Sequence, residues 1–255
     1  MVALAASLFY VGGMFLNDAF DHRHDARSQP TRPIPAGLIG AREVYRIGFG
    51  LLAAGALLMV GCALALDPAR ATRTAGAALA LGASIVLYDA WHKGNAVGPV
   101  IMGTCRMLVY VCAALITADA AGFRLGIGAA ALLAYLIGLT YAAKQESLAR
   151  VGSWWPLLFL AAPLGATLLI AGPMLLARPL VWLLLPAFAL WVVRAVRILM
   201  ARGPGSVPRA VVALIAGISL CDALFAAASG ATVAGAGAAL ALPVTLLLQR
   251  WVKGA

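Results

Sequence analysis

Three aspartates near the amino terminus have the types and spacing to bind a metal ion. Asp18, Asp21 and Asp25 follow one another at steps of three and four residues. If the chain is helical here, these steps place the three carboxylates on one face, since each residue turns an α-helix by about 100°. Carboxylates on one face repel one another unless a cation lies among them, and Mg²⁺ suits such a site because it recruits substrate phosphates. The spacing predicts a Mg²⁺-bridged diphosphate site, with a solvated loop at a membrane surface as the open alternative.

A proline-rich segment follows the aspartates and carries one arginine. In the run 31–37, Pro33 and Pro35 lack backbone donors, and each favours extended geometry for the residue before it. The segment therefore cannot continue a helix, and we expect a stiff strut that holds Arg32 over the acidic face, where it can meet a metal-bound phosphate. A rigid connector between two helices is the alternative reading of the same composition.

The composition places these residues in a polytopic membrane protein. Hydrophobic residues make up 64% of the chain and charged residues 11%. A membrane-spanning helix needs about 20 mostly apolar residues, and this criterion marks about nine spans in an all-α transmembrane bundle that forms one domain over 1–255. The predicted spans are 1–17, 44–66, 73–91, 96–118, 125–143, 153–174, 179–200, 207–229 and 232–250.

The distribution of Lys and Arg orients the spans and excludes nucleic acid as a partner. The net charge is +10, but the basic residues flank apolar runs and form no patch interleaved with aromatic residues. Fourteen Lys or Arg residues fall on the side of the acidic loop and four on the other. Because cationic residues accumulate on the cytoplasmic side, we expect the loops 17–43, 88–95 and 143–152 to be cytoplasmic.

The acidic stretch and the segment after it resemble a known pair of motifs. Asn17-Asp18-Ala19-Phe20-Asp21, with Asp25 four residues on, and the run RPIPAG at 32–37 resemble the NDxxDxxxD and RPIPxG motifs of the UbiA superfamily of intramembrane prenyltransferases. The resemblance implies a helical bundle in the lipid bilayer of a bacterial inner membrane that uses Mg²⁺ to hold a prenyl diphosphate. It implies transfer of the prenyl group to an aromatic or related lipophilic acceptor.

The resemblance also assigns roles to individual residues. It makes Asp18, Asp21 and Asp25 the metal-binding catalytic carboxylates, with Asn17 beside them. Contacts to the departing diphosphate are implied for the cations Arg23, Arg32 and Lys93.

A second region, Tyr88 to Asn95, resembles the family's Tyr-x-x-x-Lys-Arg loop. In that comparison Tyr88 joins the site, and His92 and Lys93 stand in place of the basic pair. From the residues alone, these side chains can equally be anchors at the membrane interface. Asp89 is either a neighbour of the metal site or an ion-pair partner of Lys93.

Two ionisable residues, Arg106 and Asp222, lie deep within predicted spans. An arginine at such a depth costs about 2.5 kcal/mol or more, so Arg106 is expected to face the bundle interior and to pair with an acid or a bound anion. Asp222 is the partner we hypothesise for a structural pair.

The sequence departs from the family pattern at two places. The family has a second motif, DxxxD, where the fifth span ends, but here Glu146 is the only carboxylate, between Lys144 and Arg150. The first motif also follows only about 17 residues, so the family's first helix is expected to be absent from this chain or lost to a misassigned start. The runs YDAWHKGN, PxxMGxCR and AKQE are similar to the divergent EboC-like branch of the superfamily.

These observations lead to one leading hypothesis and two rivals. The leading hypothesis is a Mg²⁺-dependent prenyltransferase in which Asn17, Tyr88, Arg106 and Glu146 complete the substrate site. A noncatalytic membrane protein that binds or moves an isoprenoid or other lipid phosphate is the second, favoured by the loss of the second aspartate motif. A transporter for small solutes is third, because the ionisable residues gather at one face. Protein partners are not predicted.

Overall fold

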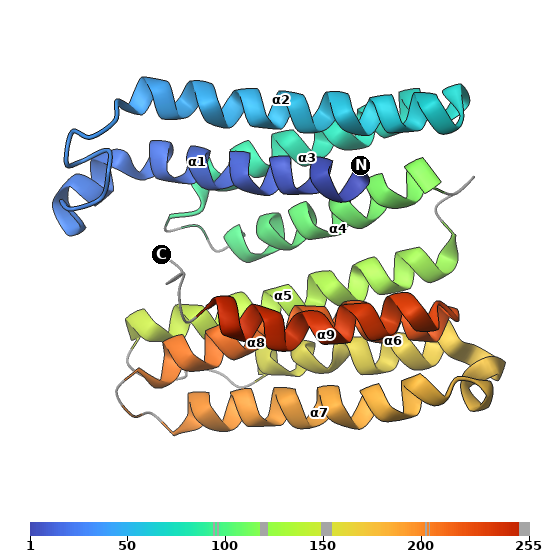
Figure 1. The fold of residues 1–255 in the computed structure, drawn as a ribbon. Coiled ribbons are helices and arrows are strands. Elements are labelled where there is room, and N and C mark those ends of the chain that lie inside the picture. The colour runs from blue at the N-terminus through green and yellow to red at the C-terminus, as the bar shows by residue number, and fades with distance from the viewer. Residues whose placement is uncertain are drawn as a thin grey trace. The chain divides into compact units, whose positions relative to one another are not determined.

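The computed structural model describes residues 1–93, 95, 97–117, 122–148, 155–201, 203 and 205–249, with the backbone alone for 144–148. In these ranges the chain is helical and has no strand, so the predicted all-α class is confirmed. Figure 1 shows the α-helices, and three short 3₁₀ helices connect or extend them. The elements are α1 (Val2–Ser28), α2 (Ala41–Leu66), η1 (Pro68–Arg70), α3 (Ala71–Trp91), α4 (Gly98–Thr117), α5 (Phe123–Leu148), η2 (Trp155–Ala161), α6 (Ala162–Ala171), η3 (Gly172–Ala177), α7 (Pro179–Met200), α8 (Ser206–Ser229) and α9 (Thr232–Leu248).

The lengths and composition of these helices define an integral membrane protein. In the described part of the chain, eight helical stretches of 20 to 27 residues are long and apolar enough to cross a membrane. The ninth predicted span corresponds to α9, a shorter apolar helix of 17 residues. The sixth, Trp155–Ala177, is not one regular helix, because Pro163 and Pro173 each begin a new helical segment and Gly172 adopts a φ of 50°.

The chain divides into two compact units, Met1–Ala121 and Gly122–Ala255. The first holds α1 to α4, and the second holds α5 to α9. The single domain expected over 1–255 stays a prediction.

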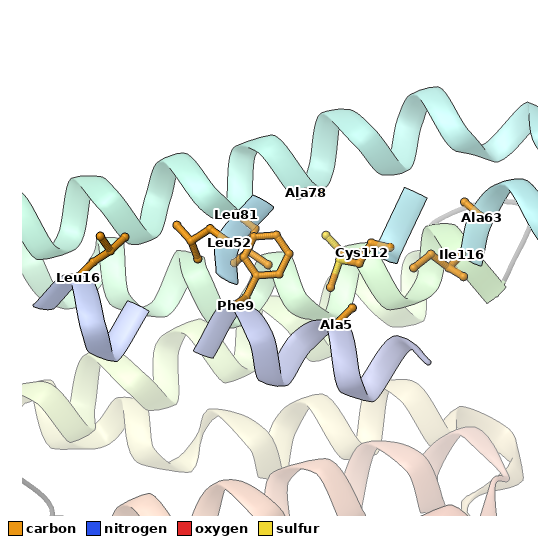
Figure 2. Packing of buried hydrophobic residues seen from close by; sticks show 10 residues of the cluster. Ala5, Phe9, Leu16, Leu52, Ala63, Ala78, Leu81, Cys112 and Ile116 are labelled. Carbon is orange, nitrogen blue, oxygen red and sulfur yellow. The ribbon is translucent and has the colours of Figure 1, made fainter. Parts of the chain in front are cut away.

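The core of the first unit forms where α1 packs against α2 and α3. Figure 2 shows the buried side chains that meet there, among them Phe9 and Leu16 from α1, Leu52 from α2, Leu81 from α3 and Ile116 from α4. All five side chains are at most 7% exposed. Burial of such side chains contributes roughly 1.5–3 kcal/mol each relative to water, so this core fixes how α1 and α3 are placed.

Two glycines allow α1 and α2 to approach closely. A β-carbon on Gly48 would lie 2.7 Å from Cγ of Leu16, and one on Gly12 would lie 3.0 Å from the carbonyl oxygen of Gly48. Both distances are shorter than a comfortable carbon contact, so only glycine fits at this crossing. Small residues at helix interfaces serve the same purpose in other membrane bundles.

Helix α1 extends well beyond the predicted span 1–17. It continues to Ser28, so Asn17 to Asp25 are helical and the condition for a one-sided acidic face is met. The chain then leaves the helix at Gln29, and Pro33 and Pro35 keep the segment out of a helix, as predicted.

The segment from residue 30 to residue 39 is not the extended strut that the prolines suggested. It folds into consecutive turns, in which the N–H of Ala36 donates to the carbonyl of Arg32 and the N–H of Leu38 donates to that of Pro33. Gly37, at a φ of 75°, supplies a left-handed residue among these turns. The prolines remove donors but not acceptors, and local hydrogen bonds to the carbonyls of Arg32, Pro33 and Ile34 compact the segment.

The second unit is organised around α8, which packs against α5, α6, α7 and α9. The hydroxyl of Tyr135 donates to the carbonyl of Leu214 at 2.8 Å, and the indole N–H of Trp191 donates to that of Ala213 at 2.8 Å. A β-carbon on Gly217 would lie 2.5 Å from the Tyr135 hydroxyl oxygen. Gly217 therefore serves helix packing.

Candidate functional site

The turns after α1 place Arg32 against the aspartates of α1. Its Nη1 lies 2.9 Å from Oδ2 of Asp25 and 3.3 Å from Oδ1 of Asp18, so one guanidinium bridges two carboxylates. The Asp25 side chain is only 6% exposed, whereas that of Asp18 is 54% exposed. Gln29 accepts a further hydrogen bond from Nε of Arg32 and fixes the direction of the side chain. The expected position of Arg32 over the acidic face is thus observed.

The remaining aspartate of α1, Asp21, faces the end of α3. Nζ of Lys93 lies 2.8 Å from Oδ1 of Asp21, and Nε2 of His92 lies 3.8 Å from Oδ2 of the same carboxylate. The His92 ring is held by stacking on Tyr88, with ring centroids 5.0 Å apart, and its Nδ1 lies 3.1 Å from the Tyr88 carbonyl oxygen. The loop that resembles the Tyr-x-x-x-Lys-Arg motif therefore lies beside the first acidic motif.

A polar contact between Asn17 and Asp89 joins the same two helices. Nδ2 of Asn17 donates to Oδ1 of Asp89 at 3.2 Å. Asp89 is buried, at 5% exposure, and its Oδ2 has no hydrogen-bond partner among the described residues. Of the two readings that the sequence left open for Asp89, the structure favours the neighbour of the acidic motif, because Lys93 pairs with Asp21 instead.

Together these contacts form one acidic cluster, which consists of Asp18, Asp21, Asp25 and Asp89. Asp18 and Asp21 act electrostatically on Asp89, and Asp21 and Asp25 act on Asp18. Arg32 and Lys93 lie around the cluster and offset part of its negative charge, and the His92 ring lies beside Asp21. Such an arrangement offers both oxygen ligands and cationic donors at one end of an apolar bundle.

The donor chemistry of the acidic cluster suits Mg²⁺, which prefers carboxylate and amide oxygens and keeps several waters. Within the described residues, however, no three acidic, histidine or cysteine side chains are grouped so as to hold a metal ion. The carboxylates of α1 are turned toward Arg32 and Lys93. Mg²⁺ commonly takes only one or two carboxylates from a protein when a substrate phosphate is present.

Two predicted substrate residues lie at the edge of the cluster. Arg23 is exposed, and its charge acts on Tyr45 of α2. Tyr88 is partly buried and contacts the cluster only through His92. The structure thus brings together Asn17, the three aspartates of α1, Arg32 and Lys93, and it places Arg23 and Tyr88 around them.

Arg106 does not face the interior of its unit. It is exposed, and its guanidinium lies over the ring of Tyr10 at 5.7 Å, a cation–π contact within α1 and α4. The Tyr10 ring on α1 thus stabilises the Arg106 charge, and the expectation that Arg106 faces the interior of the whole bundle stays a prediction. The hypothesised partner Asp222 belongs to the second unit, so that pairing stays a prediction, and the side chains of Glu146 and Lys144 lie outside the described residues.

Two contacts of the site were missed in the sequence. The hydrogen bond from Asn17 to Asp89 joins residues 72 positions apart, and the approach of His92 to Asp21 depends on how α3 packs against α1. One signal was present, since Asp89 is a carboxylate within an apolar run of α3 and charges in such runs are rare outside functional sites.

Fold and site thus define a class: a helical integral membrane protein with an acidic cluster and basic side chains at one end of its first unit. The chain is similar in sequence to two curated proteins, both digeranylgeranylglyceryl phosphate synthases. The chain is 36% identical to that of Ignicoccus hospitalis over 88 residues, which is 34% of this chain and 26% of the relative. It is 33% identical to that of Metallosphaera sedula over 58 residues, or 23% of this chain and 20% of the relative.

The matches therefore span about a quarter or less of these relatives' length. No protein-family profile matches the chain, and no solved structure matches it. The predicted resemblance to the UbiA superfamily is confirmed by the two relatives. The assignment to the EboC-like branch stays a prediction.

Proposed function

We propose that this protein is a UbiA-like prenyltransferase that moves a prenyl group from a prenyl diphosphate to an aromatic or other small lipophilic acceptor. The observation that carries the proposal is the meeting of α1 and α3 at the acidic cluster, where Arg32 and Lys93 contribute cationic donors. The names of the two relatives support the same reaction class at the family level.

The cationic side chains would bind the diphosphate. Arg32 offers a planar guanidinium that can form two parallel hydrogen bonds to phosphate oxygens, and Lys93 offers a compact charge about 40% exposed. Both side chains now contact carboxylates, so they are already held at the place where a diphosphate would meet them. Charge that develops on the departing diphosphate would be stabilised by these fixed donors.

The carboxylates would hold a divalent cation, which we propose to be Mg²⁺. Asp18, Asp21 and Asp25 are the proposed ligands, and Asn17 lies on the same segment of α1. When bound, Mg²⁺ would neutralise diphosphate charge and so favour departure of that group. The side chains of Asp21 and Asp25 are only 12% and 6% exposed, and this low exposure to water strengthens electrostatic interactions at these carboxylates.

The apolar helices would accommodate the prenyl chain and exclude water from the electrophilic carbon. Deprotonation of the acceptor by Glu146 or by water is left open by the sequence. We also propose that the loops 17–43, 88–95 and 143–152 face the cytoplasm of a bacterial cell, on the basis of the Lys and Arg distribution.

A second candidate function is a noncatalytic protein that binds an isoprenoid or other lipid phosphate. It is favoured by a specific observation: Arg32 and Lys93 pair with the carboxylates of α1, and no three-ligand group is formed among the described residues. The segment 144–150 also offers Glu146 alone where the family has two aspartates.

The two candidates are separated by Mg²⁺-dependent release of diphosphate. Purified protein in lipid nanodiscs would be given geranylgeranyl diphosphate and a pool of aromatic and lipid acceptors, and released diphosphate and prenylated product would be measured. We expect release only with Mg²⁺, and we expect Asp21→Asn to slow it about a hundredfold, as loss of a transition-state stabilising group does.

A matched control is Asp67→Asn. Asp67 lies between α2 and α3, where it pairs with Arg70 at 3.2 Å, away from the acidic cluster. The Asp67→Asn variant should release diphosphate at the same rate as the wild type. If wild type and Asp21→Asn release diphosphate equally slowly while both still bind the prenyl diphosphate, the noncatalytic candidate is correct.

A further inference from the structure

Among the contacts described for the acidic cluster, Oδ2 of Asp89 stands out because it is buried and unpaired. Asp89 is only 5% exposed, and its Oδ2 is buried with no hydrogen-bond partner in the part of the chain that the structure describes. Oδ1 of the same group accepts from Asn17. Because the two oxygens of a carboxyl group are close together, Oδ2 also lies beside the acidic segment of α1.

A buried carboxylate oxygen with no partner is unfavourable. Burial of an unpaired charge costs several kcal/mol, and buried polar atoms are nearly always hydrogen-bonded. Asp18 and Asp21 increase the cost, because both act electrostatically on Asp89. Either a proton or a bound cation would relieve this cost.

The neighbouring side chains do not supply that charge. Nζ of Lys93 pairs with Asp21, and Nε2 of His92 approaches the same aspartate. Nδ1 of His92 contacts the backbone carbonyls of Tyr88 and Asp89, not the Asp89 carboxylate. Among the described residues, each aspartate of α1 has a cationic partner, whereas Asp89 has only the neutral amide of Asn17.

We propose that Asp89 is a further ligand of the divalent cation at this site. The inference rests on the proposed function, because that function requires the cation. Asp89 would contribute Oδ2, and its hydrogen bond to Nδ2 of Asn17 leaves Oδ1 of Asn17 as a second oxygen donor from α1. A metal ligand on α3 would add a carboxylate to a chain that has only Glu146 in the segment 144–150.

The proposal agrees with the small number of converging carboxylates. Mg²⁺ is commonly bound through one or two carboxylates, with waters and substrate phosphates as the remaining ligands. Asp89 with Asn17 meets this requirement without disturbing the ion pairs of Arg32 and Lys93. The alternative is a positioning role, in which Asp89 only orients Asn17.

Cation binding tests the proposal without any turnover. Mn²⁺ would serve as the paramagnetic probe in place of Mg²⁺, and its bound fraction would be measured by electron paramagnetic resonance on the full chain in detergent. We expect the wild type to bind Mn²⁺ and Asp89→Asn to bind it at least tenfold more weakly. Asp67→Asn, in the Asp67–Arg70 pair, should bind like the wild type.

Thermal unfolding provides a second measurement that a positioning role would not move. Without divalent cations, Asp89→Asn should unfold at the same temperature as the wild type or higher, because it removes an unpaired buried charge and keeps an acceptor for Asn17. Addition of Mg²⁺ should raise the unfolding temperature of the wild type and not that of Asp89→Asn. An equal rise in both proteins, or equal Mn²⁺ affinity, would overturn the proposal.

The outcomes also distinguish this inference from the proposed function. Mg²⁺-dependent prenyl transfer with an unchanged Mn²⁺ affinity in Asp89→Asn leaves the function standing and removes Asp89 from the ligands. If Mn²⁺ binding depends on Asp89 but no prenyl transfer is detected, the proposed cation site stands and the proposed enzyme activity fails. A wild type that binds no Mn²⁺ overturns the inference directly.

Discussion

The two units use their polar side chains in opposite ways. In the first unit, charged groups from α1, α3 and the turns after α1 gather at one end and pair with one another. In the described part of the second unit, buried donors such as Tyr135 and Trp191 act singly, and each contacts a backbone carbonyl of α8. The paired cations of the first unit can release their carboxylates and bind an anionic ligand instead. A single buried donor that contacts a backbone carbonyl only stabilises helix packing. Under the proposed function, the first unit supplies the side chains that bind the diphosphate.

The largest expected effect comes from removal of Arg32. Arg32→Met leaves the buried Asp25 and the exposed Asp18 without their shared cation, and loss of one partner of a largely buried pair costs about 3 kcal/mol or more. We expect this loss in the free energy of unfolding, measured by denaturant titration in detergent. Arg32→Lys should recover part of it.

The matched control for this change is Arg70→Met. Arg70 pairs with Asp67, whose side chain is 39% exposed, so the cost should be nearer 1 kcal/mol. An equal loss in the free energy of unfolding for Arg32→Met and Arg70→Met would show that the ion pairs of Arg32 stabilise the protein no more than the Asp67–Arg70 pair does.

A smaller effect is expected at the crossing of α1 and α2. Gly48→Val would drive a side chain into Leu16 and the backbone of Gly12, and overpacking of this kind costs about 2 kcal/mol. The same unfolding measurement applies. Gly50→Val is the matched control, since a β-carbon on Gly50 meets nothing within 4 Å.

If the two glycine variants unfold alike, the close approach of α1 and α2 is not what positions the acidic residues. If only Gly48→Val is destabilised, binding of diphosphate should weaken with it, because α1 carries three of the four clustered carboxylates.

Removal of Lys93 should affect binding more than stability. Its side chain is 40% exposed, so Lys93→Met should barely change unfolding. Loss of one charge-assisted contact to phosphate should weaken the affinity for inorganic diphosphate about tenfold, which corresponds to about 1.4 kcal/mol. Isothermal titration calorimetry would measure it, with Arg124→Met in the second unit as a control expected to bind normally.

The smallest effect is expected in the second unit. Tyr135→Phe removes the hydrogen bond to the Leu214 carbonyl and should cost about 1 kcal/mol in the free energy of unfolding, with no change in diphosphate affinity. Tyr10→Phe, an exposed tyrosine of α1, should leave stability unchanged. A fall in diphosphate affinity for Tyr135→Phe would contradict the division of roles between the units.

Local spacing made part of the site predictable. The steps of Asp18, Asp21 and Asp25 predicted one helical face, and the helix continues through them. The prolines of the following segment correctly predicted the end of α1, but not the turns, which depend on hydrogen bonds between nearby backbone groups. Arg106 was expected to face inward because depth in a span was the only criterion, and its cation–π partner Tyr10 lies on another helix.

The sequence by itself determined that the chain is a helical membrane protein with a motif-bearing acidic segment, because hydropathy and residue spacing act locally along the chain. The tertiary structure alone decided which carboxylate meets which cation. Arg32 bridges Asp18 and Asp25, Lys93 takes Asp21, and Asp89 is left with an amide. The turns after α1 set the partners of Arg32, and the packing of α1 against α3 sets those of Lys93 and Asp89, which lie 72 residues from their partners.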